Sequence, residues 1–416
     1  MTVRTVYEHQ PLRLGEGLTK EQLAALQAFH GEADHFPYYR LIHRGVRFKS
    51  YVGVLRVGDL TIEVLPKADA HDGRENYWRN RLFDMLRVVH DLPLHSPSTS
   101  HLRTRPHDVL HLYLRLLLEH AETLVRRGLH RAYHGERRNT TALSGRLLFA
   151  EHLRYNLVHK ERFFVVRDRF DFATPHNQIL RQALQVAVRL NHDPALRPRL
   201  QQLLEQWPTL PELPIIAETF ARLRYPRGTE AYRPAVAIAR LLLLRHAPTR
   251  RGGRDLPALL FDMNRLWEAF LERTLRRTLP DYEVSGQQSD AYFHSPAFTS
   301  TIRPDITLRR NGKISAILDA KWKVLTHDRP SSGDLQQLYT YAHFHGAERV
   351  ALLYPSTNSE ARPQVQGRFG KEQGRADDPA CGVLFLPFPA REVSLHSWMA
   401  ELGGTVRAWL ASYYRC

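Results

Sequence analysis

Cysteine and long apolar runs are both scarce in this 416-residue sequence. The two cysteines, Cys381 and Cys416, cannot form a framework of several disulfides or a multi-cysteine zinc site, and their scarcity favours a reducing compartment. The first residues lack the apolar stretch of a secretion signal, and the longest apolar run, at 235–244, is broken by Arg240 and is too short to span a bilayer. We therefore expect a cytoplasmic protein with no membrane partner.

Several catalytic motifs are also missing. There is no Gly-x-x-x-x-Gly-Lys-Ser/Thr phosphate-binding loop, so any hydrolysis of a nucleoside triphosphate must come from another polypeptide. There is no His-Glu-x-x-His zinc motif either, and we interpret the pairs His107/His111 and His343/His345 as structural or solvated. Trp78 and Trp207 are expected in the core.

Positive charge is abundant. Lysine and arginine number 59 against 43 acidic residues, which gives a formal charge of +16. Such an excess favours a polyanionic partner such as DNA, although a basic surface inherited from an arginine-rich genome is the alternative. Because the basic residues are spread along the whole chain, charge alone does not locate the binding surface.

The order of predicted elements indicates a mixed α/β protein with three consecutive parts. Residues 1–166 are expected to form a β-rich domain with helices, with a helix at 18–30 capped by Thr19 and strands within 38–67. Residues 167–254 are expected to be mainly helical, starting at Thr174-Pro175, and the basic Pro/Gly-rich stretch 247–255 is the expected boundary. Residues 255–416 alternate helix and strand, which predicts an α/β domain, with a loop at 356–379.

Two short predicted strands carry the most informative side chains. Pro304-Asp305 opens the first, and Asp319-Ala320-Lys321 closes the second. Alternation along a strand places Asp319 and Lys321 on one face. Two carboxylates and the Ala320 carbonyl are hard oxygen ligands that suit Mg²⁺, which can polarise a phosphodiester and activate a water. The constellation predicts a nuclease, with Lys321 positioning the water, deprotonating it or stabilising the charge that develops.

The turn between these strands decides whether the two aspartates meet. A tight two-residue Asn311-Gly312 turn with strict register would put Asp305 opposite Leu318, on the wrong face. A three-residue loop with Gly312 in a left-handed G1 bulge would put Asp305 opposite Ile317, beside Asp319. The nuclease hypothesis therefore predicts a bulged hairpin.

Neighbouring helices supply further candidates. Asp334, Gln337 and Tyr341 fall on one face of the helix that follows the strands. Gln337 could bind the Lys321 region or a phosphate, and Tyr341 could brace it. Upstream, Glu268 lies at the edge of the apolar stripe of the helix 262–279 and could add a metal oxygen. Each feature alone is also compatible with an ordinary polar helix face.

Together these segments resemble McrC, the endonuclease subunit of the modification-dependent 5-methylcytosine restriction system. The resemblance covers most of the chain and rests on the following segments: Ile62-Glu-Val-Leu-Pro-Lys67, Leu143-Ser-Gly-Arg146, Asp171-Phe-Ala-Thr-Pro-His-Asn177, Asp262-Met-Asn-Arg-Leu-Trp-Glu268, Pro304-Asp305, Leu318-Asp-Ala-Lys-Trp-Lys323 and Asp334-Leu-Gln-Gln-Leu-Tyr-Thr-Tyr341. Trp322 and Trp267 stand where the family more often has tyrosine and phenylalanine.

The resemblance implies a PD-(D/E)xK nuclease domain at the carboxyl end, Mg²⁺ dependence, and catalytic roles for Asp305, Asp319, Lys321, Glu268 and Gln337, with Asp305, Asp319, Ala320 and Glu268 as metal ligands. It also implies a partner, a hexameric McrB-type AAA+ GTPase that recognises and moves modified DNA and is stimulated by this subunit. By the same analogy, the segment 38–67, with Arg44, Arg47, Lys49 and Arg56, is the expected contact with that motor.

Two other functions stay open on the sequence alone. The Gln-x-x-x-Tyr helix also occurs in RecB-like exonucleases, so a stand-alone nuclease of repair or recombination is possible. A non-catalytic DNA-binding regulator of a motor is the other alternative, against which the intact Asp305, Asp319 and Lys321 argue.

Overall fold

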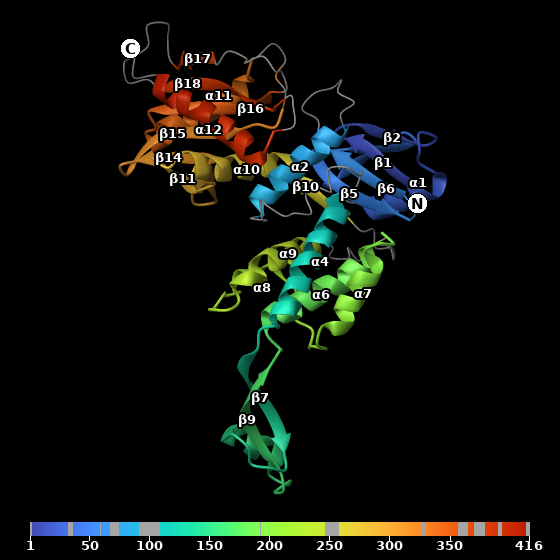
Figure 1. Cartoon of the computed structure of the whole chain (residues 1–416). Helices are drawn as coiled ribbons and strands as arrows, with labels where there is room; N and C mark the ends of the chain where they lie inside the picture. The colour runs from blue at the N-terminus through green and yellow to red at the C-terminus, as the bar shows by residue number, and fades with distance from the viewer. Residues whose placement is uncertain are drawn as a thin grey trace. The chain divides into compact units, whose positions relative to one another are not determined.

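The computed structural model describes residues 2–31, 36–58, 60–66, 75–90, 109–191, 193–245, 258–323, 325, 329–356, 365–369, 379–389 and 393–412. These residues form two compact units. The first combines Met1–Val109 with Pro248–Cys416, and the second is Leu110–Ala247 (Figure 1).

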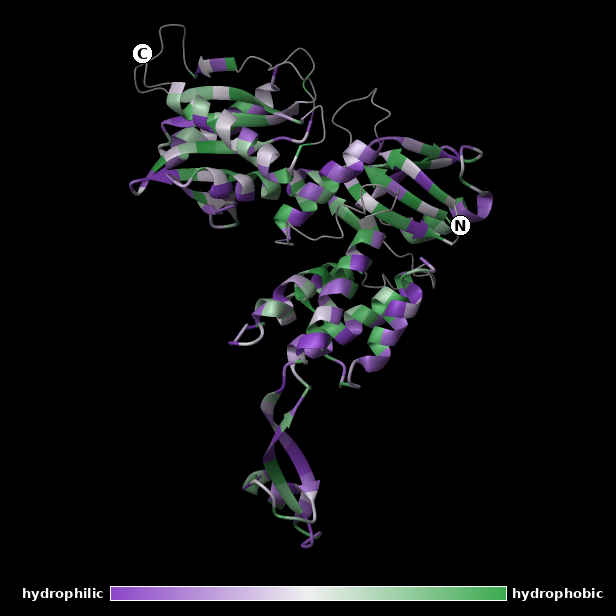
Figure 2. Cartoon of the chain, in the orientation of Figure 1, coloured by the Kyte–Doolittle hydropathy of each residue, from purple (hydrophilic) through white to green (hydrophobic). Residues whose placement is uncertain are grey.

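The amino-terminal part of the first unit is built on a four-stranded sheet. Its order is β1-β6-β5-β10, with bounds Thr2–Tyr7, Leu60–Leu65, Tyr51–Val57 and Ala258–Asp262. Strand β6 is buried along its whole length, and both β5 and β6 are coloured as predominantly hydrophobic in Figure 2. A smaller sheet has the order β2-β4-β3, with bounds Pro11–Arg13, Gly45–Phe48 and Tyr39–Ile42. Helix α1 (Lys20–His30) begins at the expected cap, Thr19, in a capping box with Gln22.

The carboxyl-terminal part of the same unit is a six-stranded sheet of order β11-β14-β15-β16-β18-β17. The bounds are Glu283–Gly286, Ile306–Arg310, Lys313–Ala320, Arg349–Ser356, Ala380–Pro387 and Val365–Arg368. The pairs β15-β16 and β16-β18 are parallel, whereas β14 is antiparallel to β15. A separate hairpin, β12 (Asp290–His294) and β13 (Thr299–Ile302), lies in the chain between β11 and β14.

Helices cover both faces of this sheet. Helix α11 (Ser332–His345) packs Leu338, Tyr341 and Ala342 against Ile317 and Val350. Because side chains alternate along a strand, Ala316 and Leu318 face the other side, where α10 (Met263–Thr278) contacts β15 and α12 (Leu395–Ser412) contacts β18. The sheet is therefore the middle layer of an α/β sandwich, as the alternation of elements predicted.

An aromatic core joins the two parts of the first unit. Helix α2 (Glu75–Val89) packs against α10 and contributes Trp78, which contacts Phe388. Phe388 in turn contacts Trp267 and Trp322. Trp78 is buried as expected. Through Phe388 it connects the amino-terminal part of the unit to Trp267 and Trp322, which are the sequence neighbours of Glu268 and Lys321.

The second unit consists of helices and a β arm. Its helices are α4 (Val109–Arg127), α6 (Pro175–Leu190), α7 (Arg197–Gln206), α8 (Ala217–Ala221) and α9 (Arg233–Arg245), with a short 3-10 helix η1 (Glu230–Tyr232). We call residues 131–171 the arm: the long antiparallel pair β7 (Ala132–Thr140) and β9 (Phe163–Asp171), with the short strand β8 (Arg146–Leu147) and helix α5 (Phe149–Asn156). Figure 1 shows the arm extending from the helices of its unit. Thr174 caps α6 with Pro175 in its first turn, and Trp207 is buried, both as predicted.

The units divide the chain differently from the three consecutive parts expected from the sequence. An end at residue 166 would cut β9, whose partner β7 begins at Ala132. A start at residue 255 would separate β10 from β5, with which it pairs. The physical reason is that strand partners far apart in sequence hold each unit together. The expected boundary at 247–255 and His107 lie entirely outside the described residues. Most of the expected loop at 356–379 also lies outside them, and its described part includes β17.

Candidate active site

The hairpin β14-β15 brings the two motif aspartates together. Asn311 and Gly312 both have positive φ, 52° and 77°, and form a tight two-residue turn that pairs Arg310 with Lys313. Farther along, Arg309 pairs with Ile314 but Leu308 pairs with Ala316, so Ser315 is an extra residue in β15. Beyond this bulge Ile306 faces Leu318, and Asp305 therefore lies opposite Asp319.

The bulge was predicted, but its position was wrong. The three-residue loop with a G1 bulge at Gly312 does not form, and Asp305 does not face Ile317. Asn311 accepts a left-handed conformation almost as readily as glycine, so the turn itself stays tight. The extra residue sits one step into the strand instead, and it produces the common face that the nuclease hypothesis required.

The aspartates differ in their surroundings. Asp319 is 1% exposed, and its Oδ2 lies 2.7 Å from Lys321 Nζ. Apart from this ion pair, Oδ2 has no hydrogen-bond partner among the described residues, so a lone pair of this oxygen remains for a metal ion. Asp305 Oδ2 accepts a hydrogen bond from the Ala320 backbone N at 2.9 Å. The chain thus fixes both carboxylates at the ends of neighbouring strands.

Lys321 is held by the helix that follows. Its Nζ donates to Gln337 Oε1 at 2.9 Å, Gln337 Nε2 donates to the Tyr341 hydroxyl at 2.7 Å, and Tyr341 donates to the Arg303 carbonyl at 3.1 Å. The expected pairing of Gln337 with the Lys321 region, and of Tyr341 as its brace, is present in the structure. Asp334, on the same helix face, instead binds Lys323 and the Tyr354 hydroxyl.

Glu268 lies on α10 close enough to interact electrostatically with Asp305 and Asp319. A residue that the sequence did not single out connects it to the pair. Gln287 donates from Nε2 to Glu268 Oε2 at 2.9 Å and from its backbone N to the Asp305 carbonyl at 3.1 Å. Gln287 has a positive φ of 48°, which is uncommon for a residue with a side chain. No sequence pattern marks such a residue, because its role depends on a contact with a helix 19 positions away.

Excess negative charge in a buried place dominates the electrostatics. Burial and the neighbouring charges of Asp319 and Glu268 raise the pKa of Asp305 to about 7. Burial also raises the pKa of Asp319 and of Glu268. Burial alone would lower the pKa of Lys321, but the charges of Asp319, Asp305 and Asp334 outweigh it and raise that pKa. One lysine therefore faces more carboxylate charge than it can neutralise.

This charge balance suits a divalent cation. Across the described ranges, no three His, Cys, Asp or Glu side chains are gathered so as to hold a metal ion alone. Mg²⁺ does not need such a cage, since it is commonly bound by one or two carboxylates and keeps several waters. Asp305 and Asp319, with the free Oδ2 lone pair, fit that ligand set, and Ala320 and Glu268 stand next to them.

The raised pKa of Asp305 predicts a pH-dependent stability of the metal-free protein. An aspartate whose folded-state pKa is near 7 binds its proton more tightly in the folded than in the unfolded chain, where the pKa is about 3.9. Stability should fall as pH rises from about 4 through 7. Asp305→Asn keeps an acceptor for Ala320 N but cannot ionise, so its melting temperature in EDTA should fall less than that of the parent between pH 5 and pH 8. Parallel melting curves for the two proteins would contradict this.

Trp322, next to Lys321, ties the site to the amino-terminal sheet. Its Nε1 donates to Oε1 of Glu8 at 2.6 Å, and Glu8 follows β1 and is 1% exposed. Trp267, next to Glu268, contacts the Trp322 ring. Lys321 is thus followed, and Glu268 preceded, by a tryptophan that packs in the aromatic core of the first unit.

The family model described as "McrBC 5-methylcytosine restriction system component" matches residues 46–355. Among solved structures, a chain in the tetradecameric assembly of Thermococcus gammatolerans McrB AAA+ hexamers with bound McrC is 21% identical with a TM-score of 0.68, covering 97% of this chain and 100% of that one. A chain of the Thermococcus gammatolerans McrBC complex is 21% identical with a TM-score of 0.50, covering 68% of this chain and 89% of that one. No curated protein sequence matches.

At these identities the solved structures establish a shared fold, which extends over nearly the whole chain for the first of them. None of the helices in the described ranges combines the length and hydropathy needed to cross a bilayer. The family model spans most of the sequence and includes every candidate site residue. As its resemblance to McrC predicted, the chain belongs to the family of McrBC 5-methylcytosine restriction system components.

Proposed function

We propose that this chain is the Mg²⁺-dependent endonuclease subunit of a modification-dependent restriction system, with a PD-(D/E)xK domain that cuts DNA in the cytoplasm. The observation that carries the proposal is the bulged hairpin that sets Asp305 opposite Asp319, with Lys321 2.7 Å from Asp319 and bound to Gln337. Buried carboxylates with raised pKa beside an ordered lysine are typical of an active site rather than of a solvated hairpin.

The roles of the residues follow from their contacts. Asp305 and Asp319 would hold Mg²⁺ together with the Ala320 carbonyl, and Glu268 would add an oxygen directly or through a water. The ion, when bound, supplies polarisation of the phosphate and a lowered pKa for a bound water. Gln337 and Tyr341 hold the Lys321 ammonium at the edge of the carboxylate pair, where it can orient a water or stabilise negative charge on the phosphate.

A partner must supply the motor, because the sequence has no phosphate-binding loop. The solved relatives are described as McrC bound to McrB AAA+ hexamers. We propose a hexameric McrB-type AAA+ GTPase as the partner, which recognises and moves DNA carrying 5-methylcytosine and whose GTP hydrolysis this chain stimulates. GTP is thus required through the partner only.

The purified chain, mixed with such a GTPase, GTP, Mg²⁺ and a cytosine-methylated plasmid, should cut the plasmid. Omitting the partner or GTP, adding EDTA in excess, or using unmethylated plasmid should each abolish cutting. Equally fast cutting without the partner would favour the repair-type nuclease instead. No cutting in the complete mixture would favour the regulator.

The basic residues expected to contact the motor differ in exposure. Of the basic residues expected to make this contact, Arg44 is exposed, whereas Arg47, Lys49 and Arg56 are half-buried. Lys49 Nζ donates to the Phe36 carbonyl, and Arg56 Nε donates to the Gly58 carbonyl. Strands β5 and β6 are paired on both edges, so they offer no free backbone to a partner.

The arm carries a large share of the exposed apolar side chains. Eight of the seventeen large hydrophobic side chains exposed in the described part of the chain belong to it: Tyr133, Leu143, Phe149, Leu153, Tyr155, Leu157, Val158 and Phe170. A concentration of exposed apolar residues is typical of an interaction surface. We therefore propose that the arm, more than residues 38–67, contacts the motor.

Substitution of the arm residues Leu157 and Val158 by serine should weaken binding to the motor. These side chains are 71% and 84% exposed, so their loss costs little folding free energy. Burial of each in an interface would contribute about 1.5–3 kcal/mol, which predicts a rise in Kd of at least roughly 100-fold for the double variant. Affinity and GTPase stimulation should both be measured.

The matched control is Ile216→Ser, an exposed aliphatic residue of the same unit outside the arm. It should bind like the parent. Unchanged affinity of the Leu157/Val158 variant would remove the arm tip from the interface.

A further inference from the structure

We propose that Asn177 fixes the direction of the arm relative to the helices of its unit. Asn177 lies in the first turn of α6 and is completely buried. It closes the segment Asp171-Phe-Ala-Thr-Pro-His-Asn177, one of the family-like stretches to which the proposed nuclease chemistry gives no role. Asn177 and all of its hydrogen-bond partners belong to this chain.

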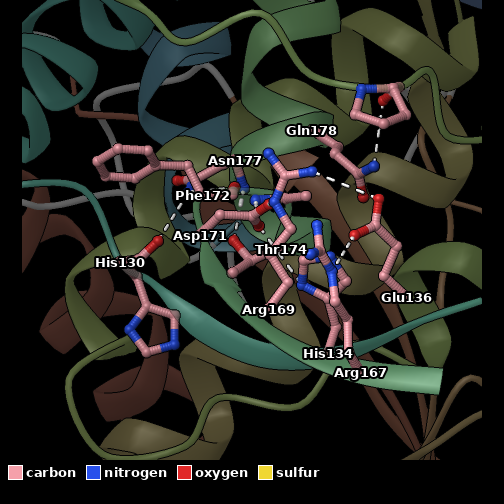
Figure 3. Close-up of polar contacts among 12 residues, drawn as sticks. His130, His134, Glu136, Arg167, Arg169, Asp171, Phe172, Thr174, Asn177 and Gln178 are labelled. Carbon is pink, nitrogen blue, oxygen red and sulfur yellow. Dashed lines mark hydrogen bonds and ion pairs between the residues drawn. The ribbon is translucent and has the colours of Figure 1, made fainter. Parts of the chain in front are cut away.

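The Asn177 amide holds both ends of the arm. Its Nδ2 donates to the His130 carbonyl and to the Phe172 carbonyl, each at 2.9 Å. His130 directly precedes the arm and Phe172 directly follows it, so the two N–H groups of a single side chain join its entry and its exit. Figure 3 shows Asn177 between these two residues, with the strands of the arm leading away.

Asn177 is also hydrogen-bonded to other helical elements of the unit, through its side chain and its backbone carbonyl. The Tyr232 hydroxyl, in η1, donates to Asn177 Oδ1 at 2.9 Å and accepts from the His130 backbone N at 2.8 Å. Trp207, at the end of α7, donates from Nε1 to the Asn177 carbonyl at 3.1 Å. Every donor and the acceptor of the Asn177 amide are thus used. Aspartate has the same shape but lacks the two donors, and glutamine would be one methylene too long.

Ion pairs and ring contacts further stabilise the part of the arm next to the Asn177 contacts. Arg169 contacts Asp171 at 2.9 Å and Glu136 at 3.5 Å, and Glu136 also contacts Arg167 at 3.2 Å. His134 lies 3.4 Å from Asp171, and alternation places all five side chains on one face of the ribbon. Tyr133 and Phe170 pack on the opposite face, and the Arg131 guanidinium lies over the Phe172 ring.

Because the strands β7 and β9 are stiff, the arm should move as a unit about the contacts that Asn177 makes. An isolated two-stranded β ribbon is only marginally stable. In the arm, the backbone hydrogen bonds between β7 and β9, the ion pairs and the ring contacts all stabilise the residues next to the helices of the unit. A change at Asn177 should therefore alter the spread of arm directions more than the internal structure of the arm.

The distance between the arm and the body tests this directly. Spin labels would be placed on Cys introduced at Val158 in the arm and at Glu205 on α7, both exposed, in a Cys416→Ser background where Cys381 is buried. Pulsed electron resonance should give a narrow distance distribution for the parent. Asn177→Asp should broaden it at least twofold, because two donors are lost and a carboxylate oxygen faces two carbonyls.

Gln178→Ala is the matched control, since it removes a neighbouring side-chain amide that bonds the Pro211 carbonyl at the surface. Its distribution should equal that of the parent. If Asn177→Asp fails to fold, Tyr232→Phe keeps the ring and removes only the hydroxyl that links Asn177 to His130, and a smaller broadening is expected. A folded Asn177→Asp variant, or in its place Tyr232→Phe, with the parental width would overturn the proposal.

A second readout rests on the proposed function. A folded Asn177→Asp variant should stimulate the GTPase less than the parent at saturating concentration, while its affinity for Mg²⁺ stays unchanged. The distance measurement needs neither motor nor DNA, so failure of the proposed function and failure of the Asn177 proposal are separable.

Discussion

Asp319→Asn should reduce DNA cleavage at least about 1,000-fold in the complete system. Asp319 is the most buried acid of the site, and its Oδ2 has no hydrogen-bond partner among the described residues apart from the ion pair with Lys321. The amide keeps the volume but removes one negative charge from the pair that would hold Mg²⁺. A metal ligand of this kind supports several kcal/mol of transition-state stabilisation, and about 1.4 kcal/mol corresponds to a factor of ten in rate.

The measurement is the single-turnover cleavage rate on methylated plasmid, with GTP hydrolysis by the partner followed in the same tube. GTPase stimulation should persist, since the arm is unchanged. Asp281→Asn, an exposed acid of the same α/β part, is the matched control and should cut at the parental rate. A rate within tenfold of the parent for Asp319→Asn would remove this residue from the catalytic site.

Arg79→Met should destabilise the first unit by about 3–5 kcal/mol, because it removes the buried guanidinium that donates to both oxygens of a buried carboxylate. Arg79 donates to both oxygens of Glu63, from Nε to Oε1 at 2.7 Å and from Nη2 to Oε2 at 2.5 Å. Glu63 is 1% exposed in the central strand β6, and Arg79 lies on α2. Thermal and denaturant unfolding would measure the loss, and a fall in melting temperature of roughly 10 °C is expected for a unit of this size.

Two companions make the result interpretable. Arg115→Met removes a partly exposed partner of Glu119 in the second unit and should cost under about 1 kcal/mol. The double change Glu63→Leu with Arg79→Met removes both charges and should recover much of the lost stability. If Arg79→Met alone unfolds like the parent, the pair does not contribute to the stability of the sheet.

Local features of the fold and of the candidate site could be predicted from the sequence. Thr19 and Thr174 cap the helices that were expected. The helical spacing placed Gln337 against Lys321 and Tyr341 against Gln337. The requirement for a bulge was readable too, because only a bulge puts Asp305 on the face of Asp319. Its position was not, since Ser315 carries no signal that distinguishes it from a regular strand residue.

Roles that depend on distant partners were out of reach. Glu63 belongs to a stretch that marked the family resemblance, yet its partner Arg79 lies on the following helix, and nothing in the stretch indicates an ion pair. Asn177 likewise meets Tyr232 across 55 positions, and Trp322 meets Glu8 across 314. The expected three-part division was misplaced for the same reason, because the pairing of β10 with β5 joins residues that composition assigns to different domains.

That pairing has a consequence for synthesis in the cell. Gly53 has a φ of 128°, and a β carbon there would lie 2.1 Å from the Leu259 carbonyl oxygen, so this edge of β5 is shaped to receive a strand translated roughly two hundred residues later. At about 5–20 residues per second, the ribosome leaves this edge unpaired for some 10–40 seconds, while the whole inserted second unit emerges and can fold. A nascent chain with an open strand edge is prone to wrong pairing. Early chaperone capture of the first hundred residues, and aggregation of fragments that stop before Ala258, are the expected signs of that delay.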